Sequence, residues 1–200
     1  MDINKKRLIV ICIIIAAALI LGVVVDMLWS AIERAAHPDK YKEIITEYSE
    51  RYAVPESVIY AVIKVESNFK ASAVSRAGAM GLMQMMPNTF LWLTGEEHLG
   101  EGLSYLSLFD PDVSIRYGTY YLKYLYDKFD GNWETVYAAY NGGEGNVAKW
   151  LADPEFSDED GNLLDIPFAE TKNYVQKVKK ERNTYQKLYY ENEVKENEQH

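Results

Sequence analysis

The residue with the clearest chemical potential in this sequence is Glu66, a single acid at the end of an otherwise apolar helical pattern. The i, i+3, i+4, i+7 spacing that defines one face of a helix is followed by Ile59, Val62, Ile63 and Glu66. Because the rest of this face is apolar, we expect Glu66 to point toward the core or into a cleft at its edge. Burial disfavours a charged carboxylate, which should raise the pKa of Glu66 and make it a candidate general acid. A Glu at a helix end can also extend to water, and the helix pattern alone leaves both readings open.

Two other segments place polar residues in unusual surroundings. The segment "GAMGLMQMMPNT" (78–89) holds Gln84 between glycines, which permit close backbone approach, and methionines. The segment "AAYNGG" (138–143) ends a helical pattern on Tyr140 and Asn141, where side chains can face a cleft. Each segment taken alone is more typical of a core segment or of a helix that ends in a turn.

Taken together, four segments resemble one family in order and spacing. They are "ESNF" (66–69), "SRAGAMGLMQMMPNT" (75–89), "AAYNGG" (138–143) and "PFAETKNYVQKV" (167–178). The sequence resembles the soluble-lytic-transglycosylase (SLT) domain of bacterial peptidoglycan lytic transglycosylases over roughly residues 40–190. The resemblance implies a goose-type-lysozyme-like fold, mainly α (α+β lysozyme-like), and peptidoglycan glycan strands as the substrate.

The resemblance also implies roles for individual residues. Glu66 corresponds to the family's single catalytic acid. Substrate-binding roles are implied for Ser75, Gln84, Met86, Tyr140, Asn141 and Tyr174. Among these, Ser75 matches a hydroxyl near the substrate N-acetyl group, Gln84 and Met86 match positions along the glycan subsites, and Tyr140 matches a tyrosine near the catalytic Glu.

The implied reaction breaks the β-1,4 bond between N-acetylmuramic acid and N-acetylglucosamine without consuming water. Most glycosidases use two carboxylates, whereas the resemblance offers one that acts twice. It first protonates the leaving oxygen and then takes the proton from the C6 hydroxyl of the same muramic acid, which attacks C1 and forms a 1,6-anhydro sugar. The attack is intramolecular, so orientation supplies much of the advantage.

Two other functions stay open on the sequence. A hydrolytic muramidase would need a carboxylate across the cleft, for which Asp110, Asp112 and the acidic loop 152–165 are candidates. An inactive glycan-binding or cell-wall assembly module would not need a protonated acid. No cofactor and no metal site is expected, because the three His are scattered and "DEDGNLLD" (158–165) fails the ligand pattern of a calcium loop.

The N-terminus predicts attachment to a membrane. Residues 8–25, "LIVICIIIAAALILGVVV", are uncharged and would span about 27 Å as a helix, near the thickness of a bilayer core. Lys5, Lys6 and Arg7 precede this segment and Asp26 follows it, so the remainder should lie outside the cytoplasm. A cleaved signal peptide is the alternative, although its apolar region is usually shorter. The only cysteine, Cys12, lies in the span, so the outer domain has no disulfide.

The remaining pattern predicts a single helical domain. We expect a cytoplasmic N-terminus (1–7), a transmembrane anchor (8–25), a stalk (26–37), the catalytic domain (38–190) and a charged tail (191–200). Helices are expected over 38–53, 55–67, 80–86, 87–93, 111–129, 133–140, 144–151 and 170–190. The acidic segment 152–169 should form a loop or small hairpin.

The charge of the chain restricts its partners. The formal net charge is −9, and without a basic face a nucleic-acid partner is not expected. The expected partners are peptidoglycan and the membrane, together with cell-wall or secretion machinery.

Overall fold

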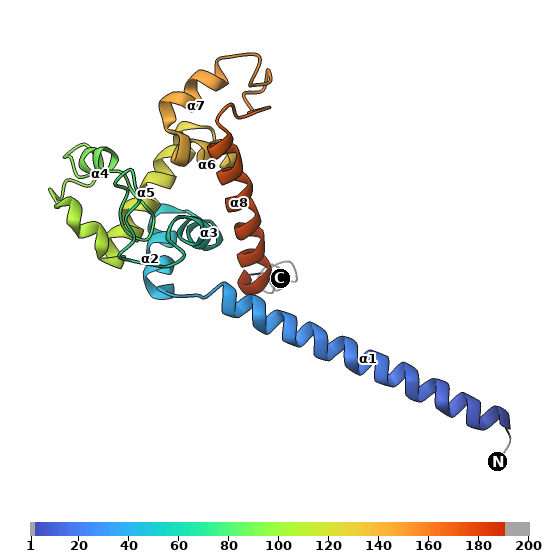
Figure 1. The fold of residues 1–200 in the computed structure, drawn as a ribbon. Helices are drawn as coiled ribbons and strands as arrows, with labels where there is room; N and C mark the ends of the chain where they lie inside the picture. Colours follow the sequence, from blue (N-terminus) through green and yellow to red (C-terminus); the bar gives the residue numbers. More distant parts are fainter. Residues whose placement is uncertain (1–2, 191–200) are drawn as a thin grey trace. The chain divides into compact units, whose positions relative to one another are not determined.

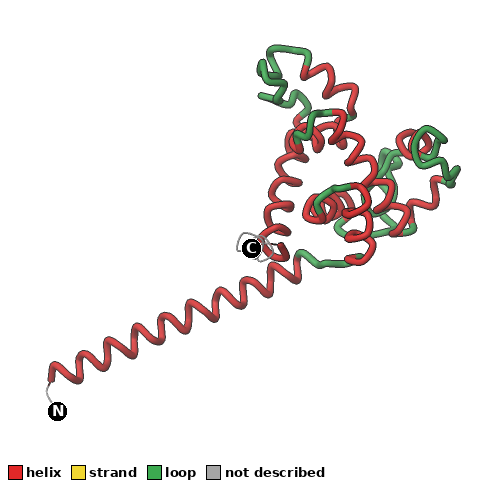
Figure 2. The backbone as a smooth tube through the Cα atoms, turned by 180° about the vertical axis from the view of Figure 1, so that it is seen from behind, coloured by secondary structure: helices red, strands yellow, loops and turns green. Residues whose placement is uncertain are grey.

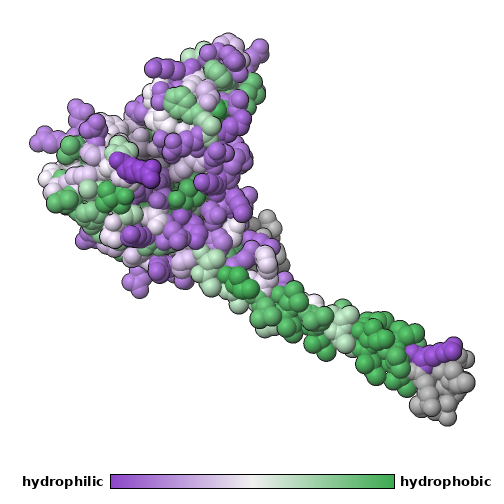
Figure 3. Space-filling model, in the orientation of Figure 1, coloured by the Kyte–Doolittle hydropathy of each residue, from purple (hydrophilic) through white to green (hydrophobic). Residues whose placement is uncertain are grey.

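The computed structural model describes residues 3–190, and the chain divides into two units, Met1–Pro38 and Asp39–His200. The first unit contains helix α1 (Ile3–Ala36). Within the described residues, only this helix, from Arg7 to Ala36, is long and apolar enough to cross a membrane, and none of its apolar window is buried. Figure 3 shows hydrophobic side chains along most of it, with hydrophilic ones toward its ends. The helix therefore continues without a break from the expected anchor into the expected stalk.

The second unit is built from helices joined by loops (Figures 1 and 2). Its elements are α2 (Lys42–Tyr52), α3 (Glu56–Ser67), α4 (Pro87–Leu93), the 3-10 helix η1 (Tyr105–Phe109), α5 (Pro111–Lys128), α6 (Trp133–Gly142), α7 (Glu144–Leu151), α8 (Ala169–Tyr185) and the π-helical turn η2 (Gln186–Tyr190). The described residues form no β-strand, only isolated bridges. The mainly helical fold is confirmed.

Helix α3 is the centre of this unit. Every residue from Ser57 to Ile63 is buried, which is typical of a helix enclosed on all sides. Its most extensive contact is with α8, and α2 also packs against it. Helix α6 packs between α5, α7 and α8. The chain thus encloses the helix that ends in Glu66.

Local sequence signals set several helix boundaries as expected. The Asp110 carboxylate accepts a hydrogen bond from the Asp112 amide and caps α5, which has Pro111 in its first turn. Asn132 caps α6 by accepting from two backbone amides. Pro87 begins α4. These signals involve only neighbouring residues, so the sequence alone is sufficient to read them.

One expectation differs from the structure. Residues 80–86 form turns rather than the short helix expected there, because Met80 pairs with Met85 in an antiparallel bridge and Gln84 takes a φ of 47°. The segment 152–169 is mostly loop with a single bridge, between Ser157 and Leu163, so of the two forms expected there the loop is the one present. The charged tail (191–200) lies outside the described residues, as do the first two residues of the N-terminal segment (1–7).

Candidate active site

Glu66 occupies the last turn of α3, where the chain reverses sharply. Asn68 and Phe69 both take left-handed conformations, with φ of 49° and 64°. The Phe69 ring is buried against Tyr60, which holds this uncommon turn in place. The Ser67 hydroxyl donates to the Leu82 carbonyl at 2.7 Å. The motif "ESNF" therefore ends the helix and fastens it to the segment around Gln84.

The loop 75–86 is fitted closely against α5 and η1. A Cβ on Gly81 would lie 2.2 Å from the Leu108 carbonyl oxygen, and its φ is 81°, so only glycine fits there. Met83 packs over Gly118 of α5 in the same way, since a Cβ on Gly118 would lie 2.3 Å from the Met83 sulfur. The Met83 amide donates to the Ser114 hydroxyl at 3.2 Å. These contacts fix the backbone of the loop beside the end of α3.

The Glu66 carboxyl group is partly buried, and burial is the main influence on its acidity. Desolvation raises the pKa of Glu66 from its ordinary 4.5 to about 7, while an interaction with the Tyr174 hydroxyl lowers it by a smaller amount. This hydroxyl is itself buried and makes no hydrogen bond of good geometry among the described residues. The Tyr174 hydroxyl therefore lies near enough to affect the pKa of Glu66 but does not form a well-aligned hydrogen bond with it. The expected rise in the pKa of Glu66 is present.

Tyr140 of α6 lies on the same side of the domain. Its hydroxyl donates to the Met83 carbonyl at 2.8 Å, not to Glu66. The charge of Glu66 nevertheless contributes, after burial, to raising the pKa of Tyr140 well above its ordinary value. Glu66 raises the pKa of Tyr174 in the same way. Glu66 therefore has two tyrosines near it, the partly buried Tyr140 of α6 and the buried Tyr174 of α8.

The other residues suggested by the sequence lie on the loop or beside it. The Gln84 amide nitrogen donates to the carbonyls of Ala73 and Gly81, at 3.1 and 2.9 Å, so it organises the loop. Ser75 is exposed and its hydroxyl oxygen accepts from the Ala79 amide at 3.0 Å. Met86 is 43% exposed. Asn141 is exposed next to Tyr140 and has no recorded contact with Glu66.

Three of the carboxylates considered as second catalytic groups make contacts elsewhere. Asp110 caps α5, and Asp112 accepts from the Tyr48 hydroxyl at 2.9 Å. Asp158 in the acidic loop accepts from the Asn162 amide at 2.8 Å. No carboxylate is among the influences on the pKa of Glu66. Among the described residues, Glu66 therefore titrates without coupling to a second acid.

Several residues of the site carry no signal that the sequence alone reveals. Ser67 and Ser114 each bind the loop backbone through a hydrogen bond, and the Tyr105 hydroxyl donates to the carbonyls of Gly78 and Met85. The Tyr121 ring lies 5.5 Å from that of Tyr140. Their roles depend on contacts between distant segments, although the glycines of 78–81 indicate a closely packed loop.

The fold and the arrangement around Glu66 define the class of protein. Residues 43–162 match the Transglycosylase SLT domain family, and the chain belongs to that family. The resemblance noted in the sequence is confirmed.

Curated relatives agree with this assignment. The chain is 34% identical, over 152 residues, to the soluble lytic murein transglycosylase of Escherichia coli K12, covering 76% of this chain and 23% of the relative. It is 31% identical, over 196 residues, to the membrane-bound lytic murein transglycosylase C of Edwardsiella ictaluri, covering 84% of this chain and 52% of the relative. The chain thus spans about a quarter of the soluble relative and about half of the membrane-bound one.

Solved structures show the same fold. The 70 kDa soluble lytic transglycosylase of Escherichia coli superposes with a TM-score of 0.72 at 31% identity, over 79% of this chain and 26% of the other. An inactive mutant of lytic transglycosylase Slt from Pseudomonas aeruginosa gives a TM-score of 0.68 at 35% identity, over 78% of this chain and 25% of the other. The membrane-bound relative and the apolar helix α1 together suggest membrane anchoring for this chain.

Proposed function

We propose that this protein is a membrane-anchored peptidoglycan lytic transglycosylase. The observation that carries the proposal is the raised pKa of Glu66, about 7, in a site formed by α3, α6, α8 and the loop 75–86. A carboxyl group that holds its proton near neutral pH can protonate the oxygen of a glycosidic bond. Relatives with the same fold are named lytic transglycosylases, which supports glycan strands as the substrate.

The reaction proceeds in two proton transfers at Glu66. Its carboxyl group gives a proton to the bridging oxygen as the bond from that oxygen to C1 of muramic acid breaks. The resulting carboxylate takes the proton of the C6 hydroxyl, whose oxygen bonds to C1. The acid is regenerated, and the new end is a 1,6-anhydro sugar with no water added. No carboxylate within residues 3–190 is among the influences on the pKa of Glu66, which supports this path over hydrolysis, since hydrolysis needs a second acid or base to position water.

The surrounding residues position the sugar in this proposal. The Gln84 carbonyl oxygen and the exposed Met86 side chain line the glycan path along the loop. Ser75 lies at the other end of the same loop, where its hydroxyl can donate to the N-acetyl group. Tyr140 and Tyr174 exclude water from Glu66, and Asn141 lies exposed beside Tyr140.

The test uses the full chain in detergent micelles with purified peptidoglycan sacculi. Mass spectrometry of the products distinguishes anhydro ends from reducing ends, because the anhydro ends lack one water. We expect anhydro ends from the wild type and none from Glu66→Gln. Reducing ends alone would instead identify a hydrolytic muramidase. Binding to sacculi with no cleavage would identify the protein as a glycan-binding module.

The proposal includes a single membrane span with the catalytic domain outside the cytoplasm. Lys5, Lys6 and Arg7 precede the apolar part of α1 and Asp26 follows the expected span, which is the charge pattern of a cytoplasmic N-terminus. Protease added to intact spheroplasts should digest the catalytic domain and leave α1 in the membrane. A protein released in soluble form, with its N-terminus downstream of residue 25, would show cleavage of a signal peptide instead.

A further inference from the structure

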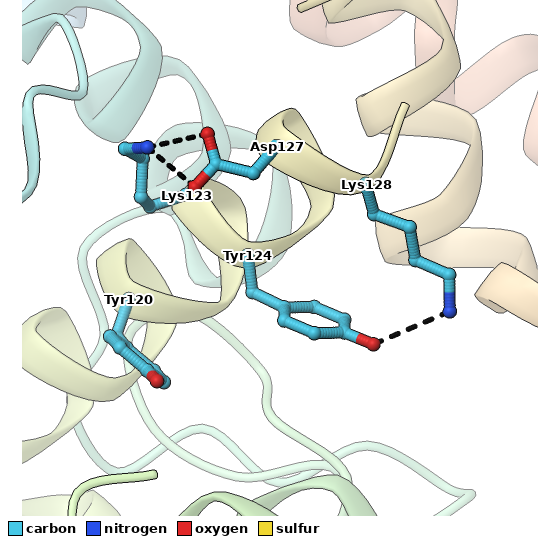
Figure 4. Close-up of a pocket in the computed structure, with 5 residues that line it drawn as sticks. All are labelled: Tyr120, Lys123, Tyr124, Asp127 and Lys128. Atoms are coloured by element: carbon cyan, nitrogen blue, oxygen red, sulfur yellow. Dashed lines mark hydrogen bonds and ion pairs between the residues drawn. The ribbon is translucent and has the colours of Figure 1, made fainter. Parts of the chain in front are cut away.

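Helix α5 carries a second group of chemically versatile side chains on one face. Positions i, i+3, i+4, i+7 and i+8 are occupied by Tyr120, Lys123, Tyr124, Asp127 and Lys128, which line a surface pocket of about 440 Å³ (Figure 4). A volume of this size lies within the range of small-ligand sites. None of these five residues belongs to the glycan-cleaving site described above.

The pocket combines two aromatic rings with charges of both signs. The Lys123 ammonium contacts both carboxylate oxygens of Asp127 at 2.5 Å. The Lys128 ammonium lies 3.3 Å from the Tyr124 hydroxyl (Figure 4). It also lies 2.9 Å from the Glu144 carboxylate. The Lys123 and Asp127 side chains are 32% and 60% exposed, so their ion pair contributes little and can exchange partners with a ligand.

A series of ring contacts connects the pocket with the site of Glu66. The Tyr124 ring lies 6.2 Å from that of Tyr121, which in turn lies 5.5 Å from that of Tyr140. Trp92 of α4, 39% exposed, contacts Tyr124 edge-on at 4.9 Å. Two ring contacts therefore connect Tyr124 in the pocket with Tyr140, whose pKa is raised in part by the charge of Glu66.

We propose that this pocket binds the peptide branches of the glycan, as a short peptide that carries a carboxylate and a free amine. The inference rests on the proposed function, because it takes peptidoglycan as the substrate. The Lys123 ammonium matches a carboxylate and Asp127 matches an amine when their exposed ion pair opens, whereas Lys128 stays paired with Glu144. The faces of Tyr120 and Tyr124 match aliphatic side chains. An uncharged sugar would use neither Lys123 nor Asp127, so the charge pattern favours the zwitterionic peptide.

The first test measures binding of a soluble peptide to the full chain in detergent by calorimetry. The probe is a synthetic tetrapeptide with a side-chain carboxylate and a diamino acid, and its N-acetylated form provides a second probe. We expect Lys123→Gln to raise the Kd for both probes about fivefold, the value of one exposed charge contact. The matched control is Lys177→Gln, which removes the same charge from an exposed position on α8. Equal affinities for wild type and Lys123→Gln would overturn the proposal.

A variant of Asp127 tests whether the pocket recognises the amine of the peptide or only attracts anions. Wild type should bind the free-amine peptide more tightly than the acetylated one, and Asp127→Asn should remove that difference. A preference that survives Asp127→Asn would show that the amine binds elsewhere and would overturn the assignment of Asp127.

A kinetic test on peptidoglycan keeps this inference distinct from the proposed function. The KM for peptide-bearing glycan should rise in Lys123→Gln relative to the KM for glycan stripped of its peptides, and the ratio is the readout. Cleavage by wild type with an unchanged ratio would overturn the peptide site alone. Failure of wild type to form anhydro ends would overturn the proposed function, whereas the calorimetric result would still decide the peptide site.

Discussion

The Tyr174 hydroxyl of α8 lies beside the Glu66 carboxyl group of α3 and is buried without a well-formed hydrogen bond. The contact exists because α3 and α8 form the most extensive helix pair of the domain. Packing of these two helices therefore sets the acidity of the proposed catalytic group. A tyrosine hydroxyl that interacts with a carboxylate stabilises its charged form and opposes the larger effect of burial.

Replacing Tyr174 by Phe should raise the pKa of Glu66 above its value of about 7, because the only influence that lowers it is removed. The alkaline limb of the rate profile, where the acid loses its proton, should move to higher pH. The pH dependence of kcat/KM on peptidoglycan measures this shift. The control is Tyr137→Phe, which deletes another buried hydroxyl that lacks a well-formed hydrogen bond and does not act on Glu66. A limb that moves to lower pH in Tyr174→Phe would contradict this account.

Replacing Glu66 by Gln should stabilise the protein at neutral and higher pH. Below pH 4.5 the folded and unfolded chains both hold the proton. Between about 4.5 and 7 the unfolded chain loses it first, so the free energy of unfolding falls as pH rises, and above 7 the loss is constant. The total loss is at most about 3 kcal/mol. Urea denaturation at pH 4 and pH 8 should show Glu66→Gln gaining stability over wild type only at pH 8. An equal difference at both pH values would show that the carboxyl group is not desolvated.

The same substitution should abolish cleavage. Loss of a general acid typically lowers the rate by about 10²–10⁴, and here the same group also serves as the base. Sacculus digestion by wild type and Glu66→Gln, at equal enzyme concentration, measures the loss. Cleavage at the wild-type rate would remove Glu66 from the proposed reaction.

The parts of the site that are local in the chain could be predicted from the sequence. The apolar face of α3 directs Glu66 inward because helix geometry is regular, and Asp110 and Asn132 cap their helices through neighbouring amides. The role of Gln84 could be predicted only in part. Its amide nitrogen binds the loop's own carbonyls, and its positive φ prevents the helix expected over 80–86.

The remaining parts depend on contacts between distant segments. The sequence does not show that the Tyr140 hydroxyl donates to the Met83 carbonyl, or that Tyr174 lies beside Glu66. The resemblance to a family supplied both tyrosines as candidates, but their partners follow from how α6 and α8 pack. Ser114 was missed for the same reason, because its bond to the Met83 amide joins α5 to a loop far away in the chain.

Replacing Tyr140 by Phe should loosen the loop that lies next to Glu66. The change removes the hydrogen bond to the Met83 carbonyl, which then lacks that partner, at a cost of about 1–2 kcal/mol in the free energy of unfolding. Removing the bond should also lower kcat, since the loop carries Gln84. Chemical denaturation and steady-state kinetics measure the two effects. The matched control is Tyr126→Phe, since the Tyr126 hydroxyl has no recorded hydrogen-bond partner within residues 3–190. If Tyr140→Phe is as stable as wild type, the hydrogen bond from Tyr140 to Met83 does not hold the loop in place.

Gly81 and Gly78 provide a matched pair for testing how closely the loop must fit. Both have positive φ, 81° and 91°, so alanine is strained at either position. A Cβ at Gly78 meets nothing within 4 Å, whereas one at Gly81 lies 2.2 Å from the Leu108 carbonyl oxygen, which belongs to the backbone and cannot rotate away. Gly78→Ala should therefore cost about 1 kcal/mol, and Gly81→Ala should cost several times more and reduce cleavage. Thermal or urea unfolding compares them, and equal losses would show that the loop can shift away from η1 without consequence.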